Sequence, residues 1–270
     1  MLRGPLLPNG TFGSISELPR SRHVTLHPEI GCHGPRESPA AFTTAVVGIP
    51  MLGGRQLRLR YGDPAADVLN GQARLWTAAV VLTDVLLDNY TETLKAGANV
   101  VELGCGLALP GMVCASFGAS VVLTDDSAEL PLIAARVAEN FDDVQTTRRG
   151  GSAKTAMLPW GDHGAARSLS SEVGGFDLVL CSDCVCVQAY GESWKLLAQS
   201  IRALCADKTI ALVSLQRRGA YDGVDEFLKI LASSLHVRRL HTVEVDGAVI
   251  EVFEIFRLKT SMLGLCSICH

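Results

Sequence analysis

Three glycines lie at close spacing in the middle of the chain, in the sequence VVELGCGLALPG that begins at residue 100. Gly104, Gly106 and Gly111 follow an apolar run, and a glycine turn between a strand and a helix cradles phosphates or nucleotides in many α/β folds. A dinucleotide fingerprint would place its third glycine at position 109, where this chain has Leu109. The Gly-Lys-Ser/Thr of a phosphate-binding loop is also absent, so the turn predicts a nucleotide-like ligand of another kind.

Two acids flank this turn at positions suited to ligand binding. Glu102 lies near the end of the predicted strand. Asp125 ends the next strand, about twenty residues after Gly106, which is the offset at which nucleotide-binding folds place a ribose-binding acid. A carboxylate there can accept hydrogen bonds from both ribose hydroxyls. Because the turn has no lysine to meet a phosphate, the sequence predicts a ligand with a ribose and without phosphate, and a positively charged nucleoside fits better than a dinucleotide.

The elements that would position these residues alternate between strands and helices. Apolar runs predict strands at 100–104, 120–124, 154–158, 176–181 and 209–215, and helical spacing predicts helices at 109–117, 128–140, 190–204 and 222–234. Two β-rich runs, 236–245 and 248–258, surround an Asp-Gly turn and predict a closing hairpin. The alternation predicts an α/β fold with a parallel sheet and helices on both faces, and the hairpin adds one antiparallel strand at or near the edge.

The part of the chain before this alternation divides into three segments. Residues 1–40 are rich in Pro, Gly, Ser, Arg and His, and we expect a disordered tail there. Residues 43–61 predict a β-hairpin around Gly53-Gly54, and 75–87 predict a helix. We therefore expect one domain over 41–260, which includes the hairpin, and a loose tail at 261–270.

Composition limits the class of protein and of partner. Hydrophobic residues make up 48% of the 270 residues and charged residues 19%, which is enough apolar material for a buried core. The net charge of −4 gives no basic excess, so nucleic acid is not the expected main partner. The nine cysteines are odd in number, and no signal peptide or membrane span is visible. We therefore expect reduced thiols in an intracellular protein of the cytoplasm or also of the nucleus.

Five stretches together resemble a known family. The glycine turn with its following acid resembles motif I of the class I, seven-β-strand, S-adenosylmethionine-dependent methyltransferases. Four further stretches are similar to the lysine-methyltransferase-like subgroup, methyltransferase family 16: the hairpin at 43–61, ARLWTAAVVL at 73–82, LPW at 158–160 and FDLVLCSDCVC at 176–186. The resemblance implies a Rossmann-like, seven-stranded, mostly parallel sheet. It also implies S-adenosyl-L-methionine as cofactor and S-adenosyl-L-homocysteine as product.

The resemblance also implies which residues hold the cofactor. These candidates are Trp76, Glu102, Gly104, Cys105, Gly106, Asp125, Trp160 and Ser182. The backbone of the glycine turn would approach the methionine part of the cofactor, where a Cβ would collide. Asp125 would hold the ribose hydroxyls, with Asp126 as a rival for that role, and Trp160 would pack on the adenine. Glu102 would either bind around the amino acid moiety or brace the loop, and Trp76 would lie beside the methionine moiety or simply pack in the core.

The resemblance implies that Asp183 is a catalytic residue, because the family's acid after the fourth strand faces the methyl donor and the substrate amine. The family motif D-x-x-Y then requires a tyrosine three residues later, where this chain has Cys186. A thiol supplies neither an aromatic wall nor a phenolic hydrogen bond. Tyr190, four residues further on, is the candidate that could replace it.

The cysteines after the fourth strand also invite a metal interpretation. Cys181, Cys184 and Cys186 form C-x-x-C-x-C, but no second pair or His cluster follows at zinc spacing. Alternate residues of a strand point to opposite faces, so the three thiols cannot easily converge. We therefore expect no metal site and interpret these cysteines as small buried side chains.

The resulting hypothesis is a protein methyltransferase that acts on a protein side chain, most simply a lysine. The departure at Cys186 leaves alternatives open: a class I methyltransferase acting on a small molecule or RNA, or a silent methyltransferase fold that only binds its partners. A nicotinamide-dependent oxidoreductase is a further alternative. The sequence does not indicate the oligomeric state or the substrate protein.

Overall fold

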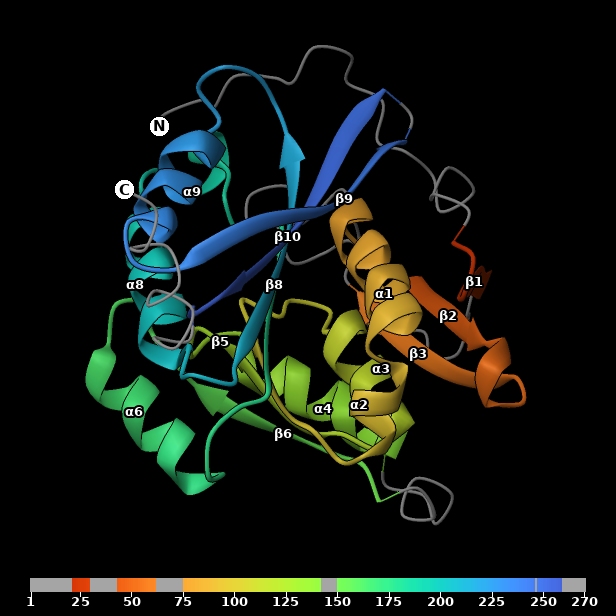
Figure 1. Ribbon diagram of the computed structural model, residues 1–270. Coiled ribbons are helices and arrows are strands. Elements are labelled where there is room, and N and C mark those ends of the chain that lie inside the picture. Colours follow the sequence, from red (N-terminus) through yellow and green to blue (C-terminus); the bar gives the residue numbers. More distant parts are fainter. Residues whose placement is uncertain (1–20, 30–42, 62–74, 142–149, 246, 259–270) are drawn as a thin grey trace, which may run out of the picture.

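The computed structural model describes residues 21–29, 43–61, 75–141, 150–245 and 247–258. A seven-stranded sheet forms its centre (Figure 1). The strands lie in the order β6-β5-β4-β7-β8-β10-β9. Their bounds are β4 Asn99–Leu103, β5 Ser120–Asp125, β6 Ser152–Met157, β7 Leu178–Ser182, β8 Ile210–Arg217, β9 His236–Val245 and β10 Ala248–Phe256. Strands β4 to β8 pair in parallel, and β10 pairs antiparallel with both β8 and β9. The predicted parallel sheet with an antiparallel strand near its edge is confirmed.

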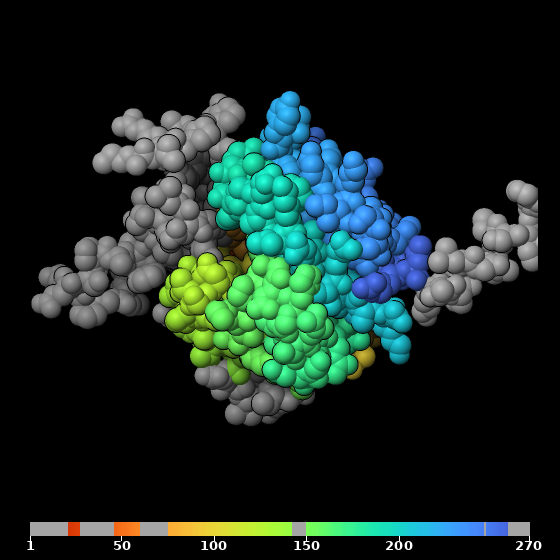
Figure 2. Space-filling model, turned by 90° about the vertical axis from the view of Figure 1, so that its left-hand side faces the viewer, coloured from red at the N-terminus to blue at the C-terminus, as the bar shows by residue number. Residues whose placement is uncertain are grey.

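Helices cover both faces of this sheet, because its central strands β4, β5, β7 and β8 are apolar on both sides. One face carries α1 Thr77–Asn89, α2 Thr91–Lys95, α3 Leu109–Phe117 and α4 Leu130–Phe141, and the other carries α6 His163–Glu172, α8 Trp194–Leu204 and α9 Val224–Ala232 (Figure 1). Successive residues of β4 illustrate the division: Val100 packs with the first group of helices and Val101 with the second. Figure 2 shows the second face, with α6 in green, α8 in teal and α9 in blue.

A small antiparallel sheet lies beside the main one and contains β1 Thr25–Glu29, β2 Thr43–Ile49 and β3 Arg55–Tyr61. Strands β2 and β3 form the predicted hairpin, with Gly53 and Gly54 in the left-handed region at φ +70° and +80°. This sheet is attached to α4 through Asn140, whose side chain accepts from the N–H of Arg58 at 2.7 Å and donates to its carbonyl at 2.9 Å. The side-chain amide of Asn140 thus pairs with the backbone of β3 as the backbone of a neighbouring strand would.

Strand β1 corrects the expectation of a disordered tail over residues 1–40. The sequence TLHPE has no alternation and contains a proline, so it carries no strand signal of its own. It becomes a strand by pairing with β2, and the preceding turn is fixed on α1 by Ser21, whose hydroxyl donates to Asp84 Oδ1 at 2.5 Å. Residues 1–20 and 30–40 lie outside the described residues, and so does the expected tail at 261–270.

Three helices differ from the sequence prediction. Helices α2 and α6 were not predicted, because α2 has five residues and α6, HGAARSLSSE, buries only Ala166 and Leu169. The helix predicted at 190–204 begins only at Trp194, as α8, and a short helix, α7 Val187–Tyr190, precedes it, with Gly191 at φ +58° between the two. Within the described ranges, no helix has the length and apolar character needed to cross a bilayer.

Candidate active site

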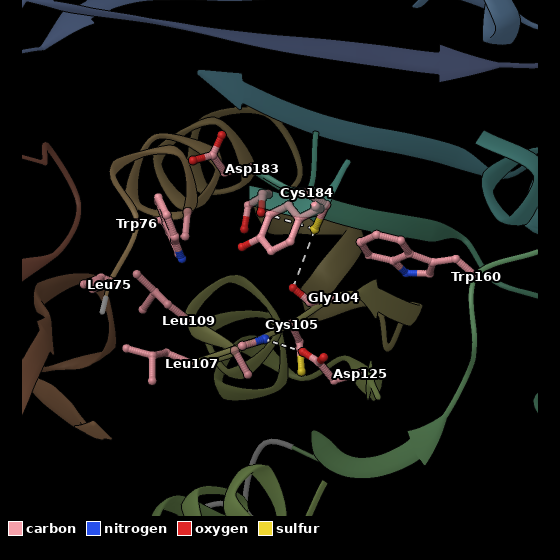
Figure 3. Close-up of a pocket in the computed structure, with 15 residues that line it drawn as sticks. Leu75, Trp76, Gly104, Cys105, Leu107, Leu109, Asp125, Trp160, Asp183 and Cys184 are labelled. Carbon is pink, nitrogen blue, oxygen red and sulfur yellow. Dashed lines mark hydrogen bonds between the residues drawn. The ribbon is translucent and has the colours of Figure 1, made fainter. Parts of the chain in front are cut away.

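A cleft lies at the carboxyl ends of β4, β5 and β7, where the strand order reverses direction around β4. This is the edge at which open α/β sheets bind their ligands. The cleft contains about 630 Å³ of empty space, part of it open to solvent. All predicted site residues except Glu102 line it: Trp76, Gly104, Cys105, Gly106, Asp125, Trp160, Ser182, Asp183 and Tyr190. Trp76 and Trp160 lie on opposite sides of the cleft, with Gly104 between them (Figure 3).

The glycine turn after β4 needs its glycines for two reasons. Gly104 and Gly106 adopt φ +59° and +50°, in the left-handed region that L side chains rarely enter. A Cβ on Gly104 would also lie 2.7 Å from Cys184 Sγ and 2.9 Å from Trp160 Cζ2. Arg136 of α4 supports the turn by donating from Nη1 to the Gly106 carbonyl at 2.9 Å. The backbone of the turn therefore forms a fixed floor of the cleft.

Asp125 connects the end of β5 to this turn. Its Oδ2 accepts from the N–H of Gly106 and its Oδ1 from the N–H of Asp126, both at 2.9 Å. A carboxylate oxygen can accept more than one hydrogen bond, so these contacts are compatible with a ligand hydroxyl at the same group. Asp126 is exposed and accepts from the N–H of Ala128 at 2.9 Å, so it caps the following turn. Of the two neighbouring acids, Asp125 is the one that lines the cleft.

Glu102 lies under the turn and does not line the cleft. It is fully buried, and its Oε2 accepts from the N–H of Gly111 in α3 at 2.9 Å. Its Oε1 is buried without a hydrogen-bond partner among the described residues. Burial raises the pKa of Glu102 from 4.5 to about 8, the hydrogen bond from Gly111 opposes this, and the charge of Asp125 adds to it. Of the two roles expected for Glu102, the geometry shows the bracing contact.

Asp183 follows β7 and takes an unusual backbone conformation. It is a non-glycine residue at φ +56°, and its side chain retains 1% exposure. Its carboxylate forms a bidentate pair with Arg218, at 2.8 Å from Oδ1 to Nη1 and 2.5 Å from Oδ2 to Nη2. Its Oδ1 also accepts from the N–H of Gln216 at 3.2 Å. In Figure 3, Asp183 lies on the same side of the cleft as Trp76.

Tyr190 lines the cleft from the end of α7, and Cys186 caps the start of that helix. The N–H of Tyr190 donates to the carbonyl of Cys186 at 2.8 Å, so the two residues are one helical turn apart. Burial raises the pKa of Tyr190 to about 12, and the Cys184 thiol and the charge of Asp183 contribute in the same direction, while Arg218 opposes them. The phenol therefore stays protonated at neutral pH and can act as a hydrogen-bond donor.

The thiols near the cleft are buried. Cys181, Cys184 and Cys186 each retain 9% exposure or less, and hydrogen bonding to Cys181 together with burial holds the pKa of Cys184 well above its ordinary value. Among the described residues, no three His, Cys, Asp or Glu side chains are grouped so that they could hold a metal ion.

Sequence reasoning did not identify Arg218, although it forms the ion pair with Asp183. The available signal was an Arg-Arg pair that follows the apolar run at 209–215 after one glutamine, at the sheet edge where ligands bind. Arg136 was also missed, because its distance of thirty residues from Gly106 is bridged only in the folded chain.

A family of known proteins, two sequence relatives and a solved structure are similar to this chain. Residues 65–234, more than half of the chain, match the family described as "Lysine methyltransferase". The chain is similar to protein N-lysine methyltransferase METTL21A of Danio rerio, with 33% identity over 63% of this chain and 71% of that protein. It is also similar to a calmodulin-lysine N-methyltransferase of Arabidopsis thaliana, with 31% identity over 49% of this chain and 41% of that protein. Among solved structures, a magnesium protoporphyrin IX methyltransferase of Synechocystis with bound SAM matches at TM-score 0.45 and 17% identity, over 68% of this chain and 86% of that chain.

Proposed function

The chain belongs to the lysine methyltransferase family, and on this basis we propose that it transfers a methyl group from S-adenosylmethionine to the side-chain amine of a lysine in another protein. The observation that carries the proposal is the convergence at one sheet edge of two groups of residues. Asp125 and the glycine turn form one side, and Asp183 and Tyr190 form the other. A donor and an acceptor can therefore meet between them.

The residues of the first side fit a nucleoside with an amino acid tail. The Asp125 carboxylate at the end of β5 can accept from the two hydroxyls of a ribose, and Trp160 offers an aromatic surface in the same cleft. The glycine turn presents backbone rather than side chains, so a polar tail can approach its N–H and carbonyl groups. When bound, S-adenosylmethionine supplies a methyl group that its sulfonium has already activated.

The second side acts on the acceptor by positioning rather than by covalent chemistry. A lysine amine must lose its proton before it can attack, because its reference pKa is about 10.4. Tyr190 is held with its phenol protonated, and the carboxylate of Asp183 is fixed in direction by Arg218 and Gln216. Fixed polar groups of this kind orient an amine in line with the methyl group and account for much of the rate of such a transfer.

The test is methyl transfer to proteins of a cell extract. Purified protein is incubated with labelled S-adenosylmethionine and extract, and the labelled band is analysed by mass spectrometry. We expect one or a few bands that carry methyllysine. The variant Asp125→Asn should bind the donor about tenfold or more weakly, because an amide replaces a charged acceptor. Asp126→Asn is the matched control, since Asp126 is exposed and bonds to the next turn.

Three outcomes would contradict the proposal. Donor binding by calorimetry without transfer to any protein would indicate a silent binding module. Label recovered in RNA or in a small molecule would indicate another substrate class. Equal labelling by wild type and Asp125→Asn would show that the cleft at β4 and β5 is not the donor site.

A further inference from the structure

A buried ion pair lies at the carboxyl ends of β7 and β8, on the Asp183 side of the cleft. Arg218 and Asp183 meet through two hydrogen bonds, and their side chains retain only 12% and 1% exposure. Bidentate, nearly dry contacts between a guanidinium and a carboxylate are among the strong polar interactions in proteins. Exposed ion pairs contribute little by comparison. This pair is therefore a permanent part of the site.

Further contacts fix the guanidinium of Arg218 in place. The N–H of Arg218 donates to Oδ2 of the buried Asp222 at 2.9 Å, and Nη2 also donates to Gln216 Oε1 at 3.0 Å. Its Cζ lies 5.8 Å from the ring centre of Trp76, within the range of a cation–π contact. The guanidinium thus lies between Trp76 and Asp183, both of which line the cleft.

Asp183 is held in its conformation by residues of β8 and the loop that follows it. A non-glycine residue stays at φ +56° only where its surroundings enforce it. The N–H of Asp183 donates to the Ser214 carbonyl at 2.8 Å, and its carboxylate is held by Gln216 and Arg218. The direction of the carboxylate is therefore determined by alternate residues of β8 and the loop after it, namely Ser214, Gln216 and Arg218.

The charge of Arg218 affects how a lysine enters this site. A carboxylate alone favours the ammonium form of a nearby amine and raises its pKa, while a neighbouring cation has the opposite effect. Methyl transfer requires the neutral amine. An uncompensated Asp183 would therefore bind the wrong protonation state of the acceptor, and the paired Asp183 would not.

We propose that Arg218 is a positioning residue that cancels the charge of Asp183 and thereby lets the acceptor lysine enter as a neutral amine. The inference rests on the proposed function and deepens it. Arg218 acts through Asp183 and takes no part in bond making. Removing its charge leaves one additional negative charge in the cleft, which has two measurable consequences.

Other titratable groups lie near this ion pair, and their effects on binding and on the pH dependence have to be distinguished from the effect of Arg218. Cys184 and Tyr190 lie near Asp183, and both have pKa values raised well above neutral, Cys184 chiefly through its hydrogen bond to Cys181 and Tyr190 chiefly through burial. Cys186 interacts electrostatically with Arg218. Asp222 contacts only the backbone of Arg218, and Asp125 acts on Cys184 from β5. The experiments below are repeated in a Cys186→Ser background, which removes that thiol.

The first consequence concerns the binding preference between donor and product. S-adenosylmethionine carries one more positive charge than S-adenosylhomocysteine, so an extra negative charge in the cleft favours the former. In Arg218→Gln, calorimetry at pH 7.5 should show the ratio of the two Kd values shifted several-fold toward S-adenosylmethionine. Arg218→Lys keeps the charge and should keep the wild-type ratio. Arg217→Gln is the matched control, because Arg217 pairs with Glu251 and Asp225 away from the cleft.

The second consequence concerns the pH dependence of transfer. Initial rates of labelling are measured from pH 7 to 10, with heat-treated cell extract as the source of acceptor. In Arg218→Gln, the rise of the rate with pH should shift upward by about one pH unit, with about a tenfold lower rate at pH 7.5 and recovery near pH 9.5. Arg218→Lys and Arg217→Gln should keep the wild-type midpoint. Thermal unfolding of each variant confirms that it is folded.

The outcomes separate the two proposals. If wild type neither binds the donor nor labels any protein, the proposed function fails. If wild type is active but Arg218→Gln loses rate equally at every pH and keeps the wild-type ratio of Kd values, Arg218 has only a structural role and the inference is wrong. If Arg218→Gln does not fold, Arg218→Met and Arg218→Lys are compared for the same two readouts.

Discussion

The buried carboxyl of Glu102 makes the stability of this protein depend on pH in a way that one substitution should remove. The carboxyl has a hydrogen bond from Gly111 to one oxygen, and the other oxygen is buried without a partner among the described residues. Burial raises its pKa to about 8, so the folded protein holds a proton there at neutral pH. Glutamine has the shape of the protonated acid and can still accept from Gly111. Glu102→Gln should therefore keep the fold and abolish this titration.

The magnitude follows from the two pKa values. The unfolded chain releases the proton near 4.5, and the folded chain keeps it until about 8. Between these values the folded state binds more protons, so the free energy of unfolding of the wild type falls as the pH rises. Each pKa unit corresponds to about 1.4 kcal/mol, which gives roughly 5 kcal/mol as an upper limit for the whole interval. Relative to wild type, Glu102→Gln should be of similar stability near pH 5 and more stable by several kcal/mol, up to roughly 5, at pH 8.5.

The assay is urea unfolding followed by circular dichroism at pH 5, 7 and 8.5. The difference between the two proteins is used, because the contributions of all other groups then cancel. The control is Glu226→Gln, since Glu226 is exposed on α9 and its substitution should change stability little at any pH. A difference that does not grow with pH would refute the reasoning. A variant that is less stable than wild type at pH 8.5 would show instead that the folded protein uses a charged Glu102.

Two further substitutions test the floor of the cleft and the attachment of the small sheet. Gly104→Ala places a Cβ against Cys184 and Trp160 at a positive φ. It should lower the free energy of unfolding by about 1–3 kcal/mol, measured by thermal unfolding, and weaken donor binding at least tenfold, measured by calorimetry. Unchanged affinity would show that the turn can rearrange. Asn140→Ala removes both hydrogen bonds to Arg58. It should lower the free energy of unfolding by about 1–2 kcal/mol and speed amide hydrogen exchange in β2 and β3. An equal rise of exchange in the central sheet would argue against a local attachment.

The fold was predictable where a segment carries its own signal. The apolar runs of β4, β5, β7 and β8 are buried on both faces, so each reads as a strand, and the closing hairpin has its Asp-Gly turn. Elements that depend on a partner were missed. Strand β1 exists through its pairing with β2, and α6 buries two side chains on a largely polar helix. Local sequence cannot show either contact.

The candidate site likewise contains residues that the sequence predicts and residues whose roles depend on packing. Gly104, Gly106 and Asp125 were predictable because they lie at or just after the ends of β4 and β5, where motif spacing fixes their places. The state of Glu102 was not, because its burial under α3 depends on how that helix packs. Nor was the pair of Asp183 with Arg218, which are thirty-five residues apart and meet because β7 and β8 are neighbours.

The family motif places a tyrosine at position 186, and α7 brings a different tyrosine, Tyr190, to the cleft. Cys186 is the N-cap residue of α7 and has an extended backbone, with φ −153° and ψ 98°. Its carbonyl accepts from the N–H of Tyr190 at the end of the helix. Cys186 is nearly buried and is not part of the cleft lining, whereas Tyr190 lines the cleft. We therefore expect Tyr190, at the other end of α7, to supply the aromatic side chain that the family motif places at position 186.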